Sequence, residues 1–278
     1  MAKSQVKQKD QTAEQTTELV VTKLAPLPVA TNQEIGPDAF EEDAGVGFGG
    51  VGVQDLAIPF ITILQSGSPQ LKRGETKVEG AEEGDIYSTV TGAVYKGTEG
   101  IYVIPCTYKK AYVEWKSRDA GGGFVRQHES PEILDETQKD AKGSDIMPNG
   151  NLIVTTAYHY VLLVDSVSGD YIEGVISMTS TQLKKSRKWN SVMNSLKMTR
   201  KDGTKFTPAM FSHLYRLTTE PESNELGAWS GWKIEIVSQT PTIDLYAAAK
   251  KFAIDINKGL IKEPTPLQTA TGDDPIPY

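Results

Sequence analysis

Aromatic and basic side chains alternate between Tyr108 and Lys116, a spacing that could bind nucleic acid. Successive side chains of an extended strand point to opposite faces, so every second residue shares one surface. A face of rings and ammonium groups could stack bases and neutralise phosphates. An ordinary half-buried strand with Tyr and Lys toward solvent explains the same alternation, and this stretch alone does not separate the two interpretations. One face would carry Tyr108, Lys110, Tyr112, Glu114 and Lys116, and the other Lys109, Ala111, Val113 and Trp115.

Basic residues are also concentrated in one later segment of the chain. The 278 residues carry a formal net charge of −7, and the first fifty hold four lysines against eight acids. Between Gln182 and Lys205, however, eight basic residues stand against Asp202 alone, a local charge of +7. Such segregation favours a basic working surface with acidic appendages over a uniformly acidic enzyme. The eight are Lys184, Lys185, Arg187, Lys188, Lys197, Arg200, Lys201 and Lys205.

The first part of this basic segment is predicted to be helical. Apolar residues recur at helical spacing from Trp189 to Leu196, which predicts an amphipathic helix over 181–198, and Thr179 and Gln182 have the spacing of a capping box. Cations are unfavourable near a helix N-terminus, so a group of them there indicates an anionic partner. A solvated polar face made of ordinary helix formers is the alternative. The cations in question are Lys184, Lys185, Arg187 and Lys188.

The sequence contains no pattern that would support catalysis. Its three histidines are far apart, no His, Cys or carboxylate cluster has metal-ligand spacing, and no nucleophile elbow or Walker loop occurs. The run Gly45–Gly52 lacks the Lys-Ser/Thr of a phosphate loop and is interpreted as a hinge. His159, between two tyrosines, is interpreted as a structural histidine. We therefore expect a binding protein rather than an enzyme, with no metal and no cofactor.

Cysteine content and hydropathy limit the compartment. Cys106 is the only cysteine in the sequence, which excludes an intrachain disulfide and favours a reducing environment. The N-terminal residues lack the apolar core of a signal peptide, and no run approaches the ~18 apolar residues of a membrane span. We expect a soluble protein of the cytoplasm that does not contact membranes.

The elements that must position these residues are mostly strands. Apolar, β-branched runs bounded by Gly, Pro and Ser predict strands, two of which form a hairpin over 152–166 and 171–180. A last helix is predicted over 242–258, and its apolar face consists of Leu245, Ala249, Phe252, Ala253 and Ile256. The fold class is thus mainly β with two or more helices.

Composition divides the chain into three parts. Residues 1–52 are predicted to form a flexible arm, residues 53–260 a folded domain, and residues 261–278 a disordered acidic tail. Inside the domain, the acidic segment 129–151 has no periodicity and predicts a long surface loop. The candidate binding residues therefore belong to a single domain, apart from those of the tail.

The last residues, GDDPIPY, resemble the acidic tip of bacterial single-stranded DNA-binding proteins, in which aspartates precede Ile-Pro-Phe. Tyr278 replaces the final Phe, and Pro275 departs from that family, which usually carries a further acid there. The resemblance implies a peptide that recruits replication or recombination proteins, with its apolar residues in a pocket and its carboxylates on basic side chains. The matching tip residues are Asp273, Asp274, Ile276, Pro277 and Tyr278.

The body of the chain resembles a different family. The runs IPFITILQSGSPQ, IYVIPCTYKKAYVEW and STQLKKSRKWNS are similar to phage-encoded single-stranded DNA-binding proteins of OB-fold type, over most of residues 53–240. This resemblance implies an OB-like β-barrel with an appended helix, a basic and aromatic groove, and a protruding tail. It also implies a role in phage DNA replication or recombination, in the host cell cytoplasm.

We therefore expect sequence-tolerant binding and protection of single-stranded DNA. Val113 and Trp115 would face the core. A virion structural or assembly protein with a β-sandwich core is the alternative, whereas a nuclease or annealing recombinase would need clustered acids or ATP chemistry that the sequence lacks. The residues expected to stack bases are Tyr108, Tyr112 and Phe124; those expected to hold phosphates are Lys109, Lys110, Lys116, Arg118 and Arg126, extended by Lys184, Lys185, Arg187 and Lys188.

Overall fold

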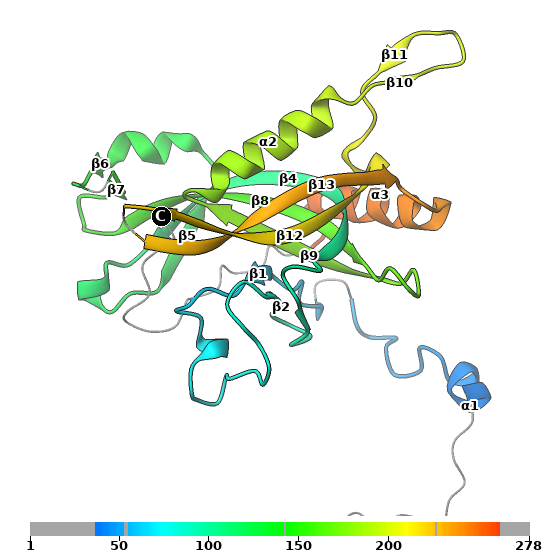
Figure 1. The fold of residues 1–278 in the computed structure, drawn as a ribbon, viewed down its shortest axis with the longest axis horizontal. Coiled ribbons are helices and arrows are strands. Elements are labelled where there is room, and N and C mark those ends of the chain that lie inside the picture. The colour runs from blue at the N-terminus through cyan, green and yellow to red at the C-terminus, as the bar shows by residue number, and fades with distance from the viewer. Residues whose placement is uncertain (1–36, 53–54, 142, 226, 262–278) are drawn as a thin grey trace, which may run out of the picture. The chain divides into compact units, whose positions relative to one another are not determined.

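The computed structural model describes residues 37–52, 55–141, 143–225 and 227–261 (Figure 1). The chain divides into two units, Met1–Gly50 and Val51–Tyr278. In the first unit, the described part consists of the short helix α1 (Pro37–Glu42) and the turns that follow it. The acidic tail and its tip, Asp273 to Tyr278, lie outside the described residues, as does most of the N-terminal arm.

The second unit is built on an eight-stranded sheet whose pairings are all antiparallel. Its order is β13-β12-β4-β8-β7-β6, with β5 also paired to β4 and β9 to β8, and the sheet curls into a half-barrel (Figure 1). The expected mainly β fold with helices is confirmed, whereas an OB-type barrel stays a prediction. The strands are β4 (Ile101–Trp115), β5 (Phe124–His128), β6 (Gln138–Lys139), β7 (Asp145–Ile146), β8 (Leu152–Val164), β9 (Tyr171–Thr179), β12 (His213–Asn224) and β13 (Gly227–Gln239).

A second, three-stranded sheet bridges the open side of the half-barrel. It consists of β1 (Ile61–Ile63), β2 (Ile86–Ser88) and β3 (Val94–Tyr95). On one side, Phe60 forms a parallel bridge with Val175 of β9. On the other, the side-chain amide of Gln65 bonds both the backbone N and the backbone O of Ser230 in β13. β9 and β13 are edge strands of the curled sheet. These contacts connect them through the segment around β1.

Two helices cover two separate hydrophobic clusters. The helix α3 (Ile243–Asn257) buries all five residues of its expected apolar face against β4 and β8, so this prediction is confirmed. Thr242 begins the helix by accepting a hydrogen bond from the backbone N of Leu245 at 3.2 Å. The helix α2 (Gln182–Ser195) covers the other cluster, in which Trp189 and Met193 pack onto β4, β8, β9, β12 and β13.

The start of α2 differs from the expected capping box. Thr181 has helical backbone angles and its side chain makes no capping hydrogen bond. Gln182 instead turns to β13, where its side-chain oxygen accepts a hydrogen bond from the backbone N of Trp232 at 3.0 Å. The contact that fixes this helix end is therefore a tertiary one. After α2, a hairpin of β10 (Met198–Thr199) and β11 (Lys205–Phe206) extends away from the sheet (Figure 1).

The segment 129–151 is structured, which differs from the expected loop. It contains the 3-10 helix η4 (Pro131–Glu136) and the short strands β6 and β7. Ile133 and Met147 are buried with Tyr112 and Ile153 in a third, smaller cluster. Other 3-10 helices are η2 (Pro69–Leu71), η3 (Arg118–Ala120) and η5 (Met210–Ser212).

Candidate nucleic-acid interface

The two faces of β4 are arranged as the alternation predicts from Tyr108 onward, but one of them is partly covered. The register of β4 against β8 shifts between Pro105 and Thr107, so the faces exchange there. Beyond the shift, Val113 is buried and Trp115 half-buried in the cluster under α3. The expectation that Tyr112 lies on an exposed face is wrong, because the residue is only 6% exposed. The structured segment 129–151 folds over it.

Glu114 organises the covered end of this face. Its carboxylate is 3% exposed and receives Asn151 Nδ2 at 2.6 Å, His128 Nε2 at 2.9 Å and Arg126 Nε at 3.0 Å. Burial alone would raise the pKa of Glu114, but these three hydrogen bonds and the charge of Arg126 lower it to about 2. Arg126, expected to hold phosphate, is thus paired with a buried acid, although 64% of its side chain stays exposed.

The other expected residues of this region are spread along the strand. Phe124 is half-buried with its ring edge-on to Trp115, at 5.9 Å between centroids. Lys116 is exposed eight residues after Tyr108, roughly 26 Å along an extended strand. The region therefore does not form one continuous platform. Of the remaining expected residues, Lys109 is half-buried, Lys110 is exposed, and Arg118 lies in η3 with its side chain outside the described part.

Tyr108 lies in the middle of β4, beside Ser186 of α2. Its ring centroid is 5.1 Å from that of His159, and burial raises the pKa of its hydroxyl. His159 is fully buried, stacks on Trp189 at 4.6 Å, and shares a 2.8 Å hydrogen bond between Nε2 and Ser186 Oγ. Burial lowers the pKa of His159 to about 3, so the ring is neutral. His159 therefore packs against α2 through Trp189 and Ser186.

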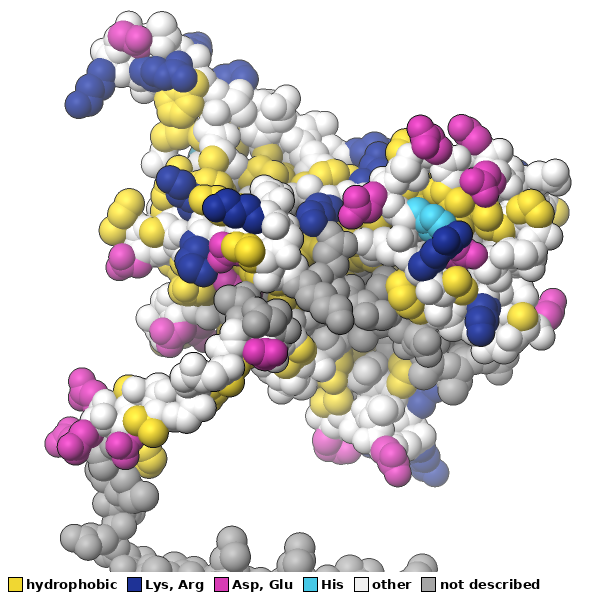
Figure 2. Space-filling view, turned by 180° about the vertical axis from the view of Figure 1, so that it is seen from behind, with side chains coloured by type: hydrophobic (Ala, Val, Ile, Leu, Met, Phe, Trp, Pro, Cys, Tyr) yellow, Lys and Arg dark blue, Asp and Glu magenta, His cyan; other side chains and the backbone are white. Residues whose placement is uncertain are grey.

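The cations of α2 have unequal surroundings. Lys185 is half-buried and forms ion pairs with Glu220, at 2.9 Å, and with Glu222. The other seven cations of residues 182–205 are all exposed. No acid of the described chain forms an ion pair with any of them. Figure 2 shows basic side chains gathered on the projecting hairpin. The exposed cations are Lys184, Arg187 and Lys188 on α2, and Lys197, Arg200, Lys201 and Lys205 around the hairpin.

One aromatic ring of the hairpin is covered by a cation. The guanidinium of Arg200 lies 4.7 Å from the centre of the Phe206 ring, a cation–π contact. Asp202, in the turn, accepts hydrogen bonds from the backbone N and hydroxyl of Thr204. The only acid of the basic segment is thus occupied within its own turn.

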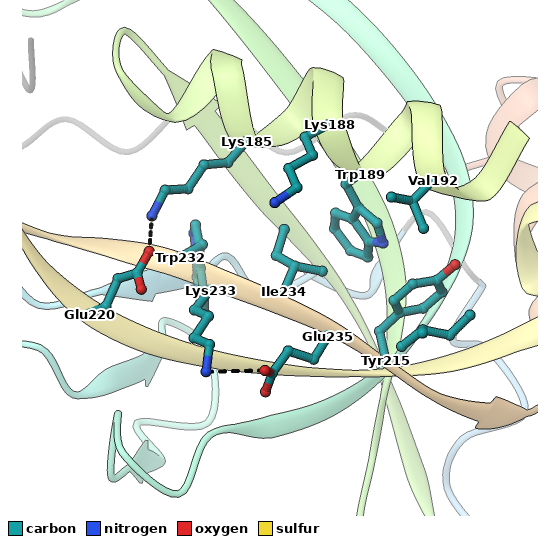
Figure 3. A pocket seen from close by; sticks show the side chains of 11 residues that line it. Lys185, Lys188, Trp189, Val192, Tyr215, Glu220, Trp232, Lys233, Ile234 and Glu235 are labelled. Atoms are coloured by element: carbon teal, nitrogen blue, oxygen red, sulfur yellow. Dashed lines mark hydrogen bonds and ion pairs between the residues drawn. The ribbon is translucent and has the colours of Figure 1, made fainter. Parts of the chain in front are cut away.

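Two adjacent grooves separate α2 from β12 and β13. The first, of ≈ 340 Å³, has an apolar floor that includes Trp189, Val192 and Tyr215 (Figure 3). Its charges are largely paired, since Lys185 bonds Glu220 and Lys233 bonds Glu235 at 3.0 Å. The second, of ≈ 540 Å³, is lined by Thr181, Lys184, Lys185, Lys188, Glu222, Ser223 and Trp229.

Trp229 is a candidate binding residue that the prediction from the sequence leaves out. Its sequence surroundings resemble those of Trp232, which is three positions later and is 3% exposed in the core. Only the pairing of β12 with β13 places Trp229 opposite Glu222 and beside α2. No local sequence signal distinguishes the two rings.

A family model described as Pam3 phage gp34-like protein matches residues 30–262. The chain belongs to the Pam3 phage gp34-like protein family. No curated protein and no solved structure matches the chain. Family membership confirms the phage origin that the resemblance implied, whereas single-stranded DNA binding stays a prediction.

The described part of this gp34-like protein contains neither a metal-ligand cluster nor a membrane-spanning helix. Within residues 37–261, apart from the few positions not described, no group of three or more His, Cys, Asp or Glu side chains is placed to hold a metal ion. None of the helices in this part of the chain is both long and apolar enough to cross a membrane. The features that stand out in the described gp34-like chain are therefore its exposed cations and the neighbouring grooves.

Proposed function

We propose that this phage protein binds single-stranded DNA without sequence preference and protects it during phage DNA replication or recombination. The observation that carries the proposal is the row of exposed cations along α2 and the β10–β11 hairpin. These cations repel one another, and those near the start of α2 also oppose the helix dipole. Binding a polyanion offsets both costs and releases counterions, so it favours the bound state at low salt.

Two aromatic rings near α2 support a single strand over a duplex. Tyr108 lies beside Ser186 of α2, and Trp229 bonds Glu222 of β12, which pairs with Lys185 of α2. Both rings are half-buried. Bases are free to stack on protein rings only where they are not paired within a duplex. Stacking also tolerates any base, since each has a π-face, which agrees with binding that ignores sequence.

A titration of fluorescein-labelled oligo-dT, followed by anisotropy over a series of salt concentrations, tests the proposal. The double variant R187Q/K188Q should bind about tenfold more weakly at low salt, and the slope of log K against log[salt] should fall by about 1.4 because two phosphate contacts are lost. The matched control K250Q/K258Q removes the same charge from two exposed lysines, one in α3 and one at its C-cap, and should change affinity less than about twofold.

Absence of oligo-dT binding by the wild-type protein at low salt would overturn the proposal. Equal weakening by both double variants would also count against it, because the effect would then follow net charge rather than the surface of α2. Sedimentation without DNA addresses the virion alternative. Large particles formed by a protein that does not bind oligo-dT would support a structural role in the virion instead.

A further inference from the structure

The larger groove beside α2 combines one aromatic ring with unpaired cations. It lies between the first turns of α2 and the end of the β12–β13 hairpin, and its volume is ≈ 540 Å³. Pockets of a few hundred Å³ hold small-molecule ligands of nucleotide size. We propose that this groove binds one nucleotide of the DNA strand, with its base on Trp229 and its phosphates on Lys184 and Lys188. The inference rests on the function proposed above and names the stacking residue.

A hydrogen bond from the ring nitrogen fixes the orientation of the Trp229 indole. Its Nε1 donates a hydrogen bond to Glu222 Oε2 at 2.9 Å, and the two residues are direct cross-strand partners in the register of β12 and β13. Glu222 in turn pairs with Lys185 and receives Gln182 Nε2 at 3.5 Å. The ring is thus oriented before any ligand arrives, so little conformational freedom remains to be lost on binding.

The lysines of the groove divide into two kinds. Lys184 and Lys188 are one helical turn apart on α2, exposed, and without an acid partner among the described residues. Lys185 is held by Glu220 and Glu222, so its ammonium is already neutralised. Lys185, expected from the sequence to hold phosphate, is therefore a positioning residue that fixes Trp229 through Glu222.

The chemistry of the groove fits a nucleotide better than an acidic peptide. Trp229 presents a flat π-surface, and base–aromatic stacking contributes about 1–3 kcal/mol per base. The free charges beside it are two ammonium groups, which suit phosphates without selecting among bases. A ligand that offers both a planar ring and anionic groups at its ends matches this set.

Tryptophan fluorescence provides a direct test in the full chain. Oligo-dT should quench the emission, and W229F should lose most of that quenching, whereas W115F should keep it. An abasic phosphodiester of the same length carries the phosphates without the bases, so it should bind more weakly and quench little. W229L, which keeps apolar bulk but has no π-face, should bind oligo-dT about tenfold more weakly.

A second pair of variants separates the two kinds of lysine. K188Q should lower the slope of log K against log[salt] by about 0.7, because one phosphate contact is lost. K185Q should leave that slope unchanged and reduce the quenching, because Glu222 no longer holds the indole. These readouts differ from that of a general loss of stability, which would alter both quantities for both variants.

The outcomes distinguish this inference from the proposed function. If the wild-type protein binds oligo-dT but W229F keeps the full quenching and W229L keeps the affinity, the groove is not the stacking site and the function stands. If K185Q changes the salt slope as much as K188Q does, Lys185 is a phosphate ligand and the positioning role is wrong. If the wild-type protein does not bind oligo-dT, the proposed function itself fails.

Discussion

Two lysines three positions apart on α2 have different surroundings. Lys185 is half-buried between Glu220 and Glu222, whereas Lys188, three positions later, is exposed and has no acid partner among the described residues. The sequence predicts that both lie on one helix, but the acids that distinguish them come from β12, more than thirty residues along the chain. For the same reason Tyr112 was expected on the surface: Met147, which helps to cover it, belongs to a segment with no periodicity.

The burial of His159 predicts that the free energy of unfolding falls in acid. Burial lowers its pKa in the folded state to about 3, below the ordinary value of 6.5, so the unfolded chain binds more protons between these values. The stability of the fold with a neutral, buried His159 is therefore fully present above pH ~6.5, and it is lost as the pH falls toward 3. We expect the free energy of unfolding, measured with urea, to fall by up to about 1.4 kcal/mol per pH unit between pH 6 and pH 5.

The variant H159F tests the assignment, because it keeps a ring against Trp189 and removes the titrating group. Its free energy of unfolding should change less between pH 6 and pH 5 than that of the wild-type protein. His213 also has a pKa lowered by burial, so H213N is the matched control, and it should keep most of the pH dependence. An unchanged slope in H159F would show that another group titrates.

Elements with a strong local pattern were predicted well, and those defined by distant contacts were not. The helix α3 and the β8–β9 hairpin follow from apolar periodicity and from a turn at Ser168 and Gly169. The segment 129–151 has few apolar residues, and its order depends on Tyr112 and on hydrogen bonds to Glu114. The bridge from Gln65 to β13 likewise joins residues 165 positions apart. Composition and periodicity carry no information about such contacts.

Glu114 predicts how firmly β5 and the segment 129–151 are attached to β4. The variant E114Q keeps the shape of the side chain but loses the charge that Arg126, His128 and Asn151 bind. We expect a loss of about 2 kcal/mol in the free energy of unfolding, since Arg126 is largely exposed and can be rehydrated. Urea unfolding gives the total, and hydrogen exchange should speed up in β5 and η4 more than in α3.

Glu129 offers a matched control for this prediction. It is exposed at the end of β5, so E129Q should change the free energy of unfolding by no more than about 0.5 kcal/mol. Equal effects of the two substitutions, or uniform acceleration of exchange in all elements, would contradict the role assigned to Glu114.

At the scale of the whole molecule, the buried clusters and the net charge are distributed differently along the chain. Among the described residues, every member of the three buried clusters lies at Phe60 or later, in the second unit. The first fifty residues contribute a net charge of −4 to the total of −7, and the segment 182–205 contributes +7. Stability is therefore expected to come from the second unit alone, while the first unit lowers the electrostatic attraction of the protein for polyanions.

Removal of residues 1–50 tests both statements in one protein. The shortened chain has a net charge of −3 instead of −7. Its unfolding temperature should stay within about 2 °C of that of the full chain, because none of the described members of the buried clusters is removed. Its affinity for oligo-dT at low salt should be equal or higher, and the difference should vanish at high salt, where exposed charges are screened.

A charge-matched variant of the full chain separates the charge of the arm from its contacts. The substitutions D38N, E41Q, E42Q and D43N remove four exposed acids and give the same net charge of −3 while the arm is kept. If charge is the cause, this variant should bind oligo-dT as tightly as the shortened chain does, since long-range attraction depends on the summed field. If the shortened chain binds more weakly than the neutralised full chain, the arm itself contacts DNA, and the interface extends beyond the second unit.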